Sequence, residues 1–257
     1  MILRKEEMPM FQIEPWLKQL ASQLQSAFSD RLLFLGLQGS YQRGEATEHS
    51  DIDVVVILDE LSPADLEQYR RILDAMPYRE KACGFVSGLR ELQSWPRYDV
   101  FQLYFDTRPL FGELSDWLPP FQREEAAEAV NVGCANLYHE LCHRCLHEPK
   151  QDADSLKACY KAAFYILQAL FYWETGRYIA TKQLLLALLT GENREILQIS
   201  LAWEQLEQDR REHSERYYQR LLHWCAQQLT RTGTEHVNSS FKSASVKKEK
   251  FRNPQLT

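Results

Sequence analysis

The sequence has no long hydrophobic run. No uninterrupted apolar stretch is longer than that from Leu184 to Leu189, whereas a membrane-spanning helix needs roughly 20 apolar residues. The N-terminal residues Met1 to Glu7 also lack the apolar stretch of a secretory signal peptide. We therefore expect a cytoplasmic protein that does not act at a membrane.

Cysteine is too sparse to form a disulfide framework. The chain has six cysteines in 257 residues and none of the features of a short secreted domain, so we expect reduced thiols. A hydrophobic content of 44% and a charged content of 26% are typical of a globular protein. The length allows one large domain or two smaller ones.

Acidic residues outnumber basic ones outside the C-terminal segment. Residues 231–257 carry six basic residues and two acidic ones, so the rest of the chain has a net charge of −10 where the whole chain has −6. A folded part this acidic matches nucleic acid poorly and suits a polycationic small molecule or a basic protein better. The segment 231–257 lacks apolar periodicity and is predicted to be disordered.

A small-residue turn follows the first predicted strand. The apolar run from Arg31 to Gln38 has strand length and stops at Gly39. Glycine lets the backbone approach a ligand closely, and Ser40 adds a hydroxyl and an exposed amide. A helix beginning at Tyr41 would point its positive end at an anion. Arg43 adds a permanent charge whose forked donors suit phosphate oxygens.

Two carboxylates stand at the start of the second predicted strand. Ile52 to Leu58 is β-branched and almost entirely apolar, as expected for a strand buried on both faces. Asp51 and Asp53 are two residues apart, so their side chains leave the same face of the sheet. Such carboxylates suit Mg²⁺ ions that are bridged to substrate phosphates. Taken alone, Gly39-Ser40 could be an ordinary turn, and Asp51-Ile52-Asp53 could be an ordinary solvated start of a strand.

Together these residues resemble a known signature. Gly39-Ser40, ten residues and then Asp51-x-Asp53 is similar to the motif of the nucleotidyltransferase superfamily that includes DNA polymerase beta. The fuller pattern, with Arg43-Gly44 and Ser50, resembles bacterial aminoglycoside nucleotidyltransferases of the kanamycin type and the minimal nucleotidyltransferases. The resemblance implies an NTP substrate, with ATP expected, and two Mg²⁺ ions. It also implies transfer of a nucleoside monophosphate to an acceptor hydroxyl with release of pyrophosphate.

The remaining elements predict an α+β fold: a small mixed sheet with flanking helices, followed by an all-α helical bundle. A helical stripe from Trp16 to Phe28 precedes the first strand. Ser62 to Asp65 has the pattern of a helix N-terminus with proline at its first position. Strands are predicted at Ala82–Ser87 and Tyr98–Phe105 with a short helix at Arg90–Trp95 between them, and Thr107-Arg108-Pro109 is predicted to end the sheet.

A change of period near Pro119-Pro120 marks the predicted domain boundary. The predicted domains are 1–118 for nucleotidyl transfer, 119–230 for the bundle and 231–257 for the tail. Helices are predicted in the bundle near Arg123–His147, Ser155–Thr175, Lys182–Leu189, Arg194–Asp209 and Arg211–Leu229. Kanamycin-type enzymes carry a helical C-terminal domain that lines the acceptor pocket, which implies the same role here.

A third carboxylate is implied by the resemblance, and three residues compete for it. Asp99, at the head of the predicted strand Val100–Phe105, resembles the acid of the minimal enzymes and is the expected third metal ligand. Kanamycin-type enzymes place a glutamate on the preceding strand, where Lys81–Phe85 has no acid. Glu80 and Asp106 lie just outside the two strands and are the other candidates. A solvated strand end is the alternative for Asp99.

The general base is expected on the helical half. In kanamycin-type enzymes a helical glutamate removes the proton of the acceptor hydroxyl, and Glu140 has a matching setting, with Glu174 as the second choice. A solvated helix acid is the alternative. The segment His139 to His143 also spells H-E-x-x-H, a zinc motif. No third ligand is evident, so ordinary helix histidines are favoured.

The expected acceptor is a small, aminoglycoside-like molecule, and nucleic acid is not expected. A protein acceptor, as in AMP-transferring minimal antitoxins, is the first alternative. Those antitoxins generally lack a long helical half, which favours the small molecule. The second alternative is a catalytically silent nucleotide-binding module, against which the Asp51 and Asp53 pair argues.

Overall fold

The structure, a computed structural model, describes residues 11–147 and 153–250, with side chains described over 11–147 and 156–233. The chain divides into two compact units. The first consists of Met1–Pro96 and Leu103–Pro120, and the second of Arg97–Gln102 and Phe121–Thr257.

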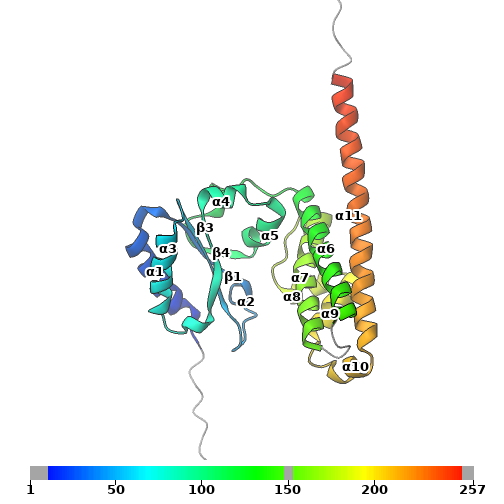
Figure 1. The fold of residues 1–257 in the computed structure, drawn as a ribbon, viewed down its shortest axis with the longest axis horizontal. Coiled ribbons are helices and arrows are strands. Elements are labelled where there is room, and N and C mark those ends of the chain that lie inside the picture. Colours follow the sequence, from blue (N-terminus) through cyan, green and yellow to red (C-terminus); the bar gives the residue numbers. More distant parts are fainter. Residues whose placement is uncertain (1–10, 148–152, 251–257) are drawn as a thin grey trace, which may run out of the picture. The chain divides into compact units, whose positions relative to one another are not determined.

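A four-stranded mixed sheet forms the centre of the first unit, in the order β3-β2-β1-β4 (Figure 1). The strands are β1 (Leu32–Gln38), β2 (Ile52–Leu58), β3 (Ala82–Gly88) and β4 (Thr107–Phe111). β1 is antiparallel to β2 and to β4, whereas β2 and β3 are parallel. The predicted α+β architecture with a small mixed sheet is therefore confirmed.

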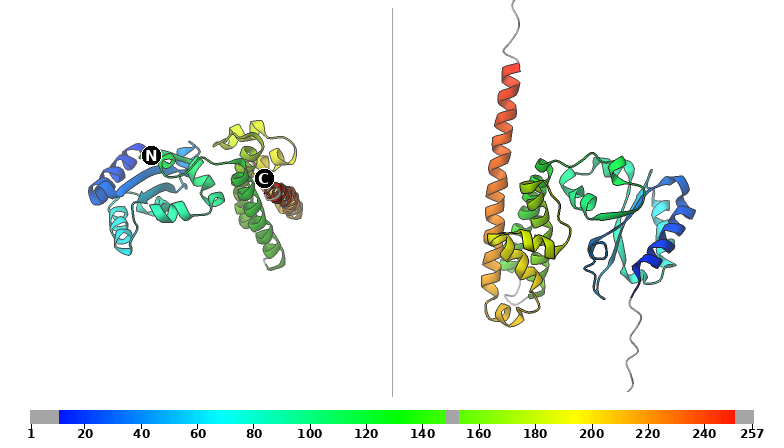
Figure 2. Two further views of the ribbon diagram at one scale, coloured as in Figure 1. Left: turned by 90° about the horizontal axis from the view of Figure 1, so that it is seen from above. Right: turned by 180° about the vertical axis from the view of Figure 1, so that it is seen from behind.

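Two helices cover one face of this sheet (Figure 1, Figure 2). They are α1 (Ile13–Phe28) and α3 (Pro63–Asp74). Burial at a spacing of three and four residues gives α1 one apolar stripe, which packs on alternate residues of β2. The shared core includes Trp16, Leu17, Leu20, Leu24, Phe28, Leu35, Leu37, Ile52, Val54 and Val56. The opposite face of β2 is therefore the one that carries the odd-numbered side chains, Asp51 and Asp53 among them.

The short elements of the first unit connect the strands. They are η1 (Ser29–Arg31), α2 (Gly39–Gln42), η2 (Arg79–Lys81), α4 (Leu89–Ser94), the last residues of α5 (Arg97–Phe105) and η3 (Leu114–Asp116). The predicted third strand and the short helix after it are confirmed as β3 and α4. Ser62 caps α3 with the predicted proline at the first helical position.

The predicted strand Tyr98–Phe105 is wrong, because these residues form the helix α5. Aromatic and β-branched residues favour strands only weakly, and tertiary packing overrides that preference. Here Val100, Phe101 and Leu103 are buried within a helix. The fourth strand lies further along the chain, in β4, where the sequence predicts the end of the sheet. Pro109 fits there because β4 is at the edge of the sheet, where a missing N–H is tolerated.

Helices make up the second unit, together with residues 97–102 of α5. They are α6 (Arg123–His147), α7 (Ala153–Thr175), α8 (Lys182–Leu188), α9 (Gly191–Leu201), α10 (Glu207–Glu212) and α11 (Ser214–Lys250). α6 packs against α7 and α11, and α7 also contacts α9. The predicted bundle is therefore present, with differences at its fourth helix and at its last.

The predicted helix Arg194–Asp209 is interrupted after Leu201. The guanidinium of Arg210 is buried against the ring of Trp203, 4.1 Å from its centroid. Its Nε donates to the Trp203 carbonyl at 2.9 Å. This side chain satisfies a carbonyl that a continuous helix would use, so α9 ends and α10 begins as a separate helix.

Buried polar side chains tie the bundle together. Gln168 is fully buried on α7, and its Nε2 donates to the carbonyls of Ile179 and Ala180 at 2.9 Å each. Its Oε1 accepts from Gln102 at 3.0 Å. Tyr160 is also buried and donates to the Tyr217 carbonyl on α11 at 2.9 Å. These bonds satisfy groups that would otherwise be costly to bury.

The last helix continues into the segment that the sequence predicts to be disordered. α11 extends to Lys250, so residues 231–250 are helical, whereas 251–257 lie outside the described residues (Figure 2). Thr232 is fully buried and accepts from Asn131 of α6 at 2.8 Å. Extending a helix that has already formed costs much less free energy than nucleating a new one. Residues 231–250 can therefore be helical although they lack apolar periodicity.

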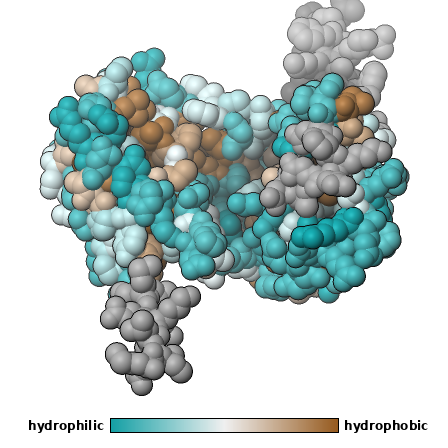
Figure 3. Space-filling model, turned by 60° about the horizontal axis from the view of Figure 1, so that its bottom comes forward, coloured by the Kyte–Doolittle hydropathy of each residue, from teal (hydrophilic) through white to brown (hydrophobic). Residues whose placement is uncertain are grey.

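Polar and charged residues make up most of the face displayed in Figure 3. Across residues 11–147 and 153–250, we find no helix with the length and hydropathy needed to cross a membrane.

The N-terminus of α3 generates a stability prediction. Asp65 is buried and accepts from the Ser62 hydroxyl at 2.7 Å and from Arg31 at 2.7 and 3.1 Å. These bonds, first among them that from Arg31, hold the pKa of Asp65 well below its usual value. The folded protein therefore binds fewer protons than the unfolded chain. The stabilisation that the ionised Asp65 gives the folded protein is complete above the unfolded pKa of about 4 and is lost as the pH falls toward the lowered pKa of the folded state.

We expect Asp65→Asn to lower the free energy of unfolding by about 1–2 kcal/mol at pH 7. Urea denaturation measures the difference, which should narrow between about pH 5 and about pH 3. Asp30→Asn, at an exposed position before β1, is the control and should show no such difference. A pH-independent effect of Asp65→Asn would contradict the assignment.

Candidate active site

The two aspartates of the signature project from the start of β2. Ile52 and Val54 point into the apolar core, so Asp51 and Asp53 project from the opposite face. Asp51 is exposed and Asp53 is half-buried. The antiparallel register places Asp53 beside Gln38, the last residue of β1. The Gly39 turn therefore begins directly beside the carboxylates, as the sequence predicts for a nucleotide site.

Gly39 and Asp53 are in close contact. Gly39 has a φ of +75°, which L side chains rarely adopt, and a Cβ built on it would lie 2.3 Å from Asp53 Oδ2. The glycine is therefore required twice, for its backbone conformation and for the space that the carboxylate occupies. No other residue type leaves the Asp53 carboxylate where it is.

The turn continues as the short helix α2. It begins at Gly39 rather than at Tyr41, the position that the sequence predicts. Ser40 is half-buried, and its carbonyl accepts from the Glu45 N–H at 2.8 Å. The Tyr41 ring packs edge-on against Phe11, with centroids 5.8 Å apart, and burial raises the pKa of its hydroxyl. α2 contacts β1, β2 and β4, so it is fixed at one end of the sheet.

A self-bonded loop connects α2 to Asp51. The Thr47 N–H donates to Ser50 Oγ at 2.9 Å, and the Ser50 N–H donates to the Thr47 carbonyl at 3.0 Å. Lys81, just before β3, donates to the Glu48 carbonyl. The parallel register pairs Ile52 with Ala82 and so brings Lys81 to this loop. The sequence gives no signal for this contact, since it depends on the pairing of β2 with β3.

Arg43 occupies a different environment from the one that the sequence predicts. Its side chain is only 3% exposed. Its Nε donates to Glu45 Oε2 at 3.1 Å, and its Nη1 pairs with Asp106 Oδ2. The guanidinium thus lies between two carboxylates of its own chain, whereas the sequence predicts that it contacts phosphate oxygens.

The structure changes the order of the third-carboxylate candidates. Asp99 heads no strand, since it lies in the first turn of α5 in the second unit. The prediction that Asp99 stands at the head of a strand, on which its role as a metal ligand rested, is therefore wrong. Asp106 directly precedes β4, whose first residue, Thr107, pairs with Gln38 of β1, and Gln38 in turn pairs with Asp53 of β2. Glu80 is exposed just before β3. Of the three, Asp106 is the acid that precedes a strand paired with β1.

The donor set fits a hard cation held by two carboxylates. Asp51 and Asp53 present carboxylate oxygens on one face, beside a turn where only a glycine fits. Mg²⁺ is commonly held by one or two carboxylates, with phosphate oxygens and water completing its shell. No group of three or more His, Cys, Asp or Glu side chains among the described residues is arranged to hold a metal ion. Substrate oxygens and water would supply the remaining ligands of such an ion.

The two candidates for the general base lie on helices of the second unit. Glu140 of α6 forms an ion pair with Arg144 one turn later, and its side chain is 45% exposed. Glu174 of α7 accepts from Arg231 at 2.6 Å. The histidines of the H-E-x-x-H segment, His139 and His143, are exposed, and their ring centroids are 6.5 Å apart.

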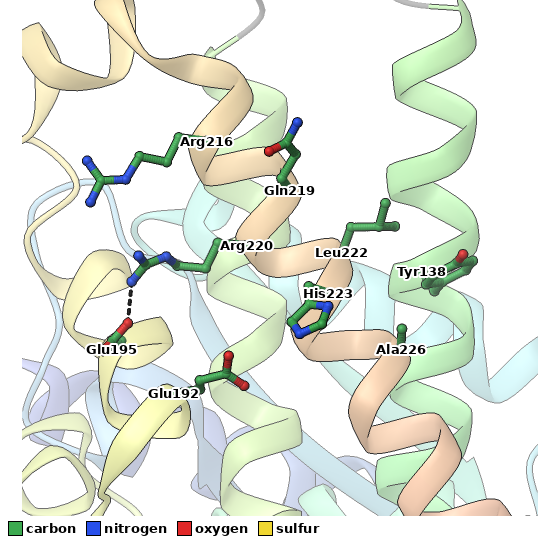
Figure 4. Close-up of a pocket in the computed structure, with 9 residues that line it drawn as sticks. All are labelled: Tyr138, Glu192, Glu195, Arg216, Gln219, Arg220, Leu222, His223 and Ala226. Atoms are coloured by element: carbon green, nitrogen blue, oxygen red, sulfur yellow. Dashed lines mark hydrogen bonds and ion pairs between the residues drawn. The ribbon is translucent and has the colours of Figure 1, made fainter.

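A separate cavity of about 740 Å³ lies in the second unit (Figure 4). Side chains from α6, α9 and α11 line it, including Tyr138, Glu192, Arg216 and the ion-paired Arg220 and Glu195. None of the signature residues of the first unit lines it. Its charges of both signs distinguish it from the carboxylate pair of β2.

The contact between Gly39 and Asp53 generates a prediction with an internal control. Gly39→Ala should displace the Asp53 carboxylate and lower nucleotidyl transfer about 100-fold. Gly44→Ala is the matched control. Gly44 also has a positive φ, of +70°, but its Cβ would meet nothing within 4 Å. Both variants should lose about 1 kcal/mol of stability.

Only Gly39→Ala should also lose activity. Steady-state transfer rates and thermal denaturation of both variants measure the two effects. Equal activity losses in the two variants would contradict the proposed contact.

Comparison with known proteins agrees with this geometry. Residues 17–104, which include the turn and both aspartates, match the family model of the nucleotidyltransferase domain. The fold is similar to the crystal structure of the spectinomycin adenyltransferase AAD(9) from Enterococcus faecialis with ATP and spectinomycin. The TM-score is 0.52 at 11% sequence identity, over 84% of this chain and 98% of that one. No curated protein sequence matches the chain.

The domain match confirms the resemblance that the Gly39-Ser40 and Asp51-x-Asp53 motifs indicate. The structural similarity extends the agreement in fold to the helical half. Residues 17–104 therefore carry a nucleotidyltransferase domain.

Proposed function

We propose that the protein transfers a nucleoside monophosphate from an NTP to a hydroxyl group of a small, aminoglycoside-like acceptor and releases pyrophosphate. The observation that carries this proposal is the contact of the Asp53 carboxylate with Gly39, which joins the phosphate turn and the carboxylate pair in one site. ATP is the proposed donor, and the similar spectinomycin adenyltransferase was crystallised with ATP.

The donor half of the reaction is assigned to the first unit. The Ser40 hydroxyl and the backbone of the Gly39 turn would bind the triphosphate, because close approach of a backbone to phosphate requires a small residue. Asp51 and Asp53 would hold Mg²⁺, with two ions proposed. When bound, Mg²⁺ neutralises phosphate charge and stabilises the attacking and leaving oxygens.

The acceptor half is assigned to the helical unit. The acceptor oxygen attacks the α-phosphorus, the bond from that phosphorus to the bridging oxygen breaks, and pyrophosphate leaves. Glu140 is the proposed base that takes the hydroxyl proton, since its carboxylate is partly exposed. The net charge of −10 outside residues 231–257 favours a polycationic acceptor. The similar adenyltransferase was crystallised with spectinomycin.

Removing one carboxylate tests the metal site. Asp51→Asn and Asp53→Asn should each lower transfer by at least about 1,000-fold and leave the fold intact, because charge at the reacting phosphate is then no longer balanced. Asp59→Asn, at the other end of β2 where Asp59 pairs with Arg31, is the control and should keep its activity. Wild-type-like transfer by either of the first two variants would refute the mechanism.

A labelling experiment tests the substrates. The protein and Mg²⁺ are incubated with one α-labelled NTP at a time. Each such reaction also contains either an aminoglycoside panel or a lysate protein fraction as the acceptor. We expect label from ATP on an aminoglycoside-like molecule, with magnesium required for its appearance. Label on a protein would support the antitoxin-like alternative instead. Absence of pyrophosphate release under all conditions would contradict transfer activity.

A further inference from the structure

We propose that Arg43 is a positioning residue, which fixes the nucleotide turn to the start of β4 through a buried bridge of ion pairs from Glu45 to Asp106. The proposal deepens the proposed function, on which its effect on catalysis rests. Its structural part, the fixing of the turn, concerns the protein without nucleotide.

The bridge is buried at the pair of Arg43 and Asp106 and partly exposed at Glu45. The side chains of Arg43 and Asp106 are 3% and 2% exposed, and that of Glu45 is 18% exposed. Nε of Arg43 contacts Glu45 at 3.1 Å, while Nη1 pairs with Asp106, 63 residues further along the chain. One guanidinium thus binds a local carboxylate and a distant one, for which its planar fork is suited.

This bridge closes a ring around the signature. The Arg43 N–H donates to the Gly39 carbonyl at 3.1 Å, so the guanidinium and the glycine belong to the same turn. Asp106 precedes Thr107, which pairs with Gln38, and Gln38 pairs with Asp53. The Gly39 turn is therefore held from the β1 side by the sheet and from the β4 side by Arg43. The position of the Asp53 carboxylate against Gly39 depends on both.

Because these charged side chains have little contact with solvent, each depends on its partners to balance its charge. Removing one member of a buried ion pair leaves an uncompensated charge in a poorly solvated place, which displaces the segment that carries it. Lysine has no planar fork and cannot reproduce the two contacts of Arg43 with the same geometry. Even the conservative change Arg43→Lys should therefore loosen the turn.

A direct phosphate contact by Arg43, the role expected from the sequence, is the competing explanation. The two roles differ in the free protein. A phosphate ligand has no function before the nucleotide binds, whereas a positioning residue holds the turn at all times. They also differ in combination with Asp106, because only the bridge makes the two residues act as one unit.

The first test measures amide hydrogen exchange over residues 39–44 in the nucleotide-free protein. Arg43→Lys and Asp106→Asn should each speed exchange there by about tenfold or more. The control is Arg31→Gln, which breaks the ion pairs with Asp59 and Asp65 and should leave exchange at residues 39–44 unchanged. Circular dichroism and urea denaturation establish that each variant is folded. Unchanged exchange in folded Arg43→Lys would overturn the proposal.

The second test is a double-mutant cycle on transfer from ATP. Arg43→Gln and Asp106→Asn should each lower kcat/KM about 100-fold, and the double variant should lose no more than the worse single variant. Losses that multiply would overturn the proposal and support a separate phosphate contact. If the wild-type protein transfers nothing, the proposed function fails, and the exchange measurement still decides on the bridge.

Discussion

The antiparallel pairing of β1 with β2 is the constraint on which the site depends. It sets Gln38 opposite Asp53, so that the turn at the end of one strand and the carboxylates at the start of the next meet at one end of the sheet. The pairing also leaves no room for a side chain at position 39, because the Asp53 carboxylate occupies that space. The position of the Asp53 carboxylate thus depends on the absence of a side chain at Gly39.

Arginine-centred ion pairs recur in the first unit. Arg31 binds Asp59 and Asp65 near the end of β2, and Arg43 binds Glu45 and Asp106 near its start. The first group is partly exposed, whereas the second is nearly buried. Because exposed ion pairs contribute little and buried ones constrain geometry strongly, the two groups have different consequences. The Arg43 group acts on the nucleotide turn, and the Arg31 group acts on the N-terminus of α3.

The helical unit has its own polar framework. The fully buried Gln168 satisfies two carbonyls and receives a bond from Gln102, while Arg210 binds the Trp203 carbonyl in the turn between α9 and α10. The Gln168 bonds fix α7, on which Glu174 lies. Glu140 lies on α6, which packs against α7 and α11. Both glutamates are paired with arginines. A base on this unit would therefore act from a carboxylate that is ion-paired in the free protein.

The sequence by itself determined the elements whose signals are local: the amphipathic α1, the capped α3, the apolar β1 and β2, the Gly39 turn and the Asp51 and Asp53 pair. Those signals depend on residue period and on the backbone freedom of glycine, which neighbouring residues alone decide. Only the tertiary structure decided that Tyr98–Phe105 is a helix, that β4 begins at Thr107, and that Arg43 pairs with Asp106. These outcomes depend on burial and on charges from distant parts of the chain, which outweigh the weak intrinsic preference of aromatic residues for strands.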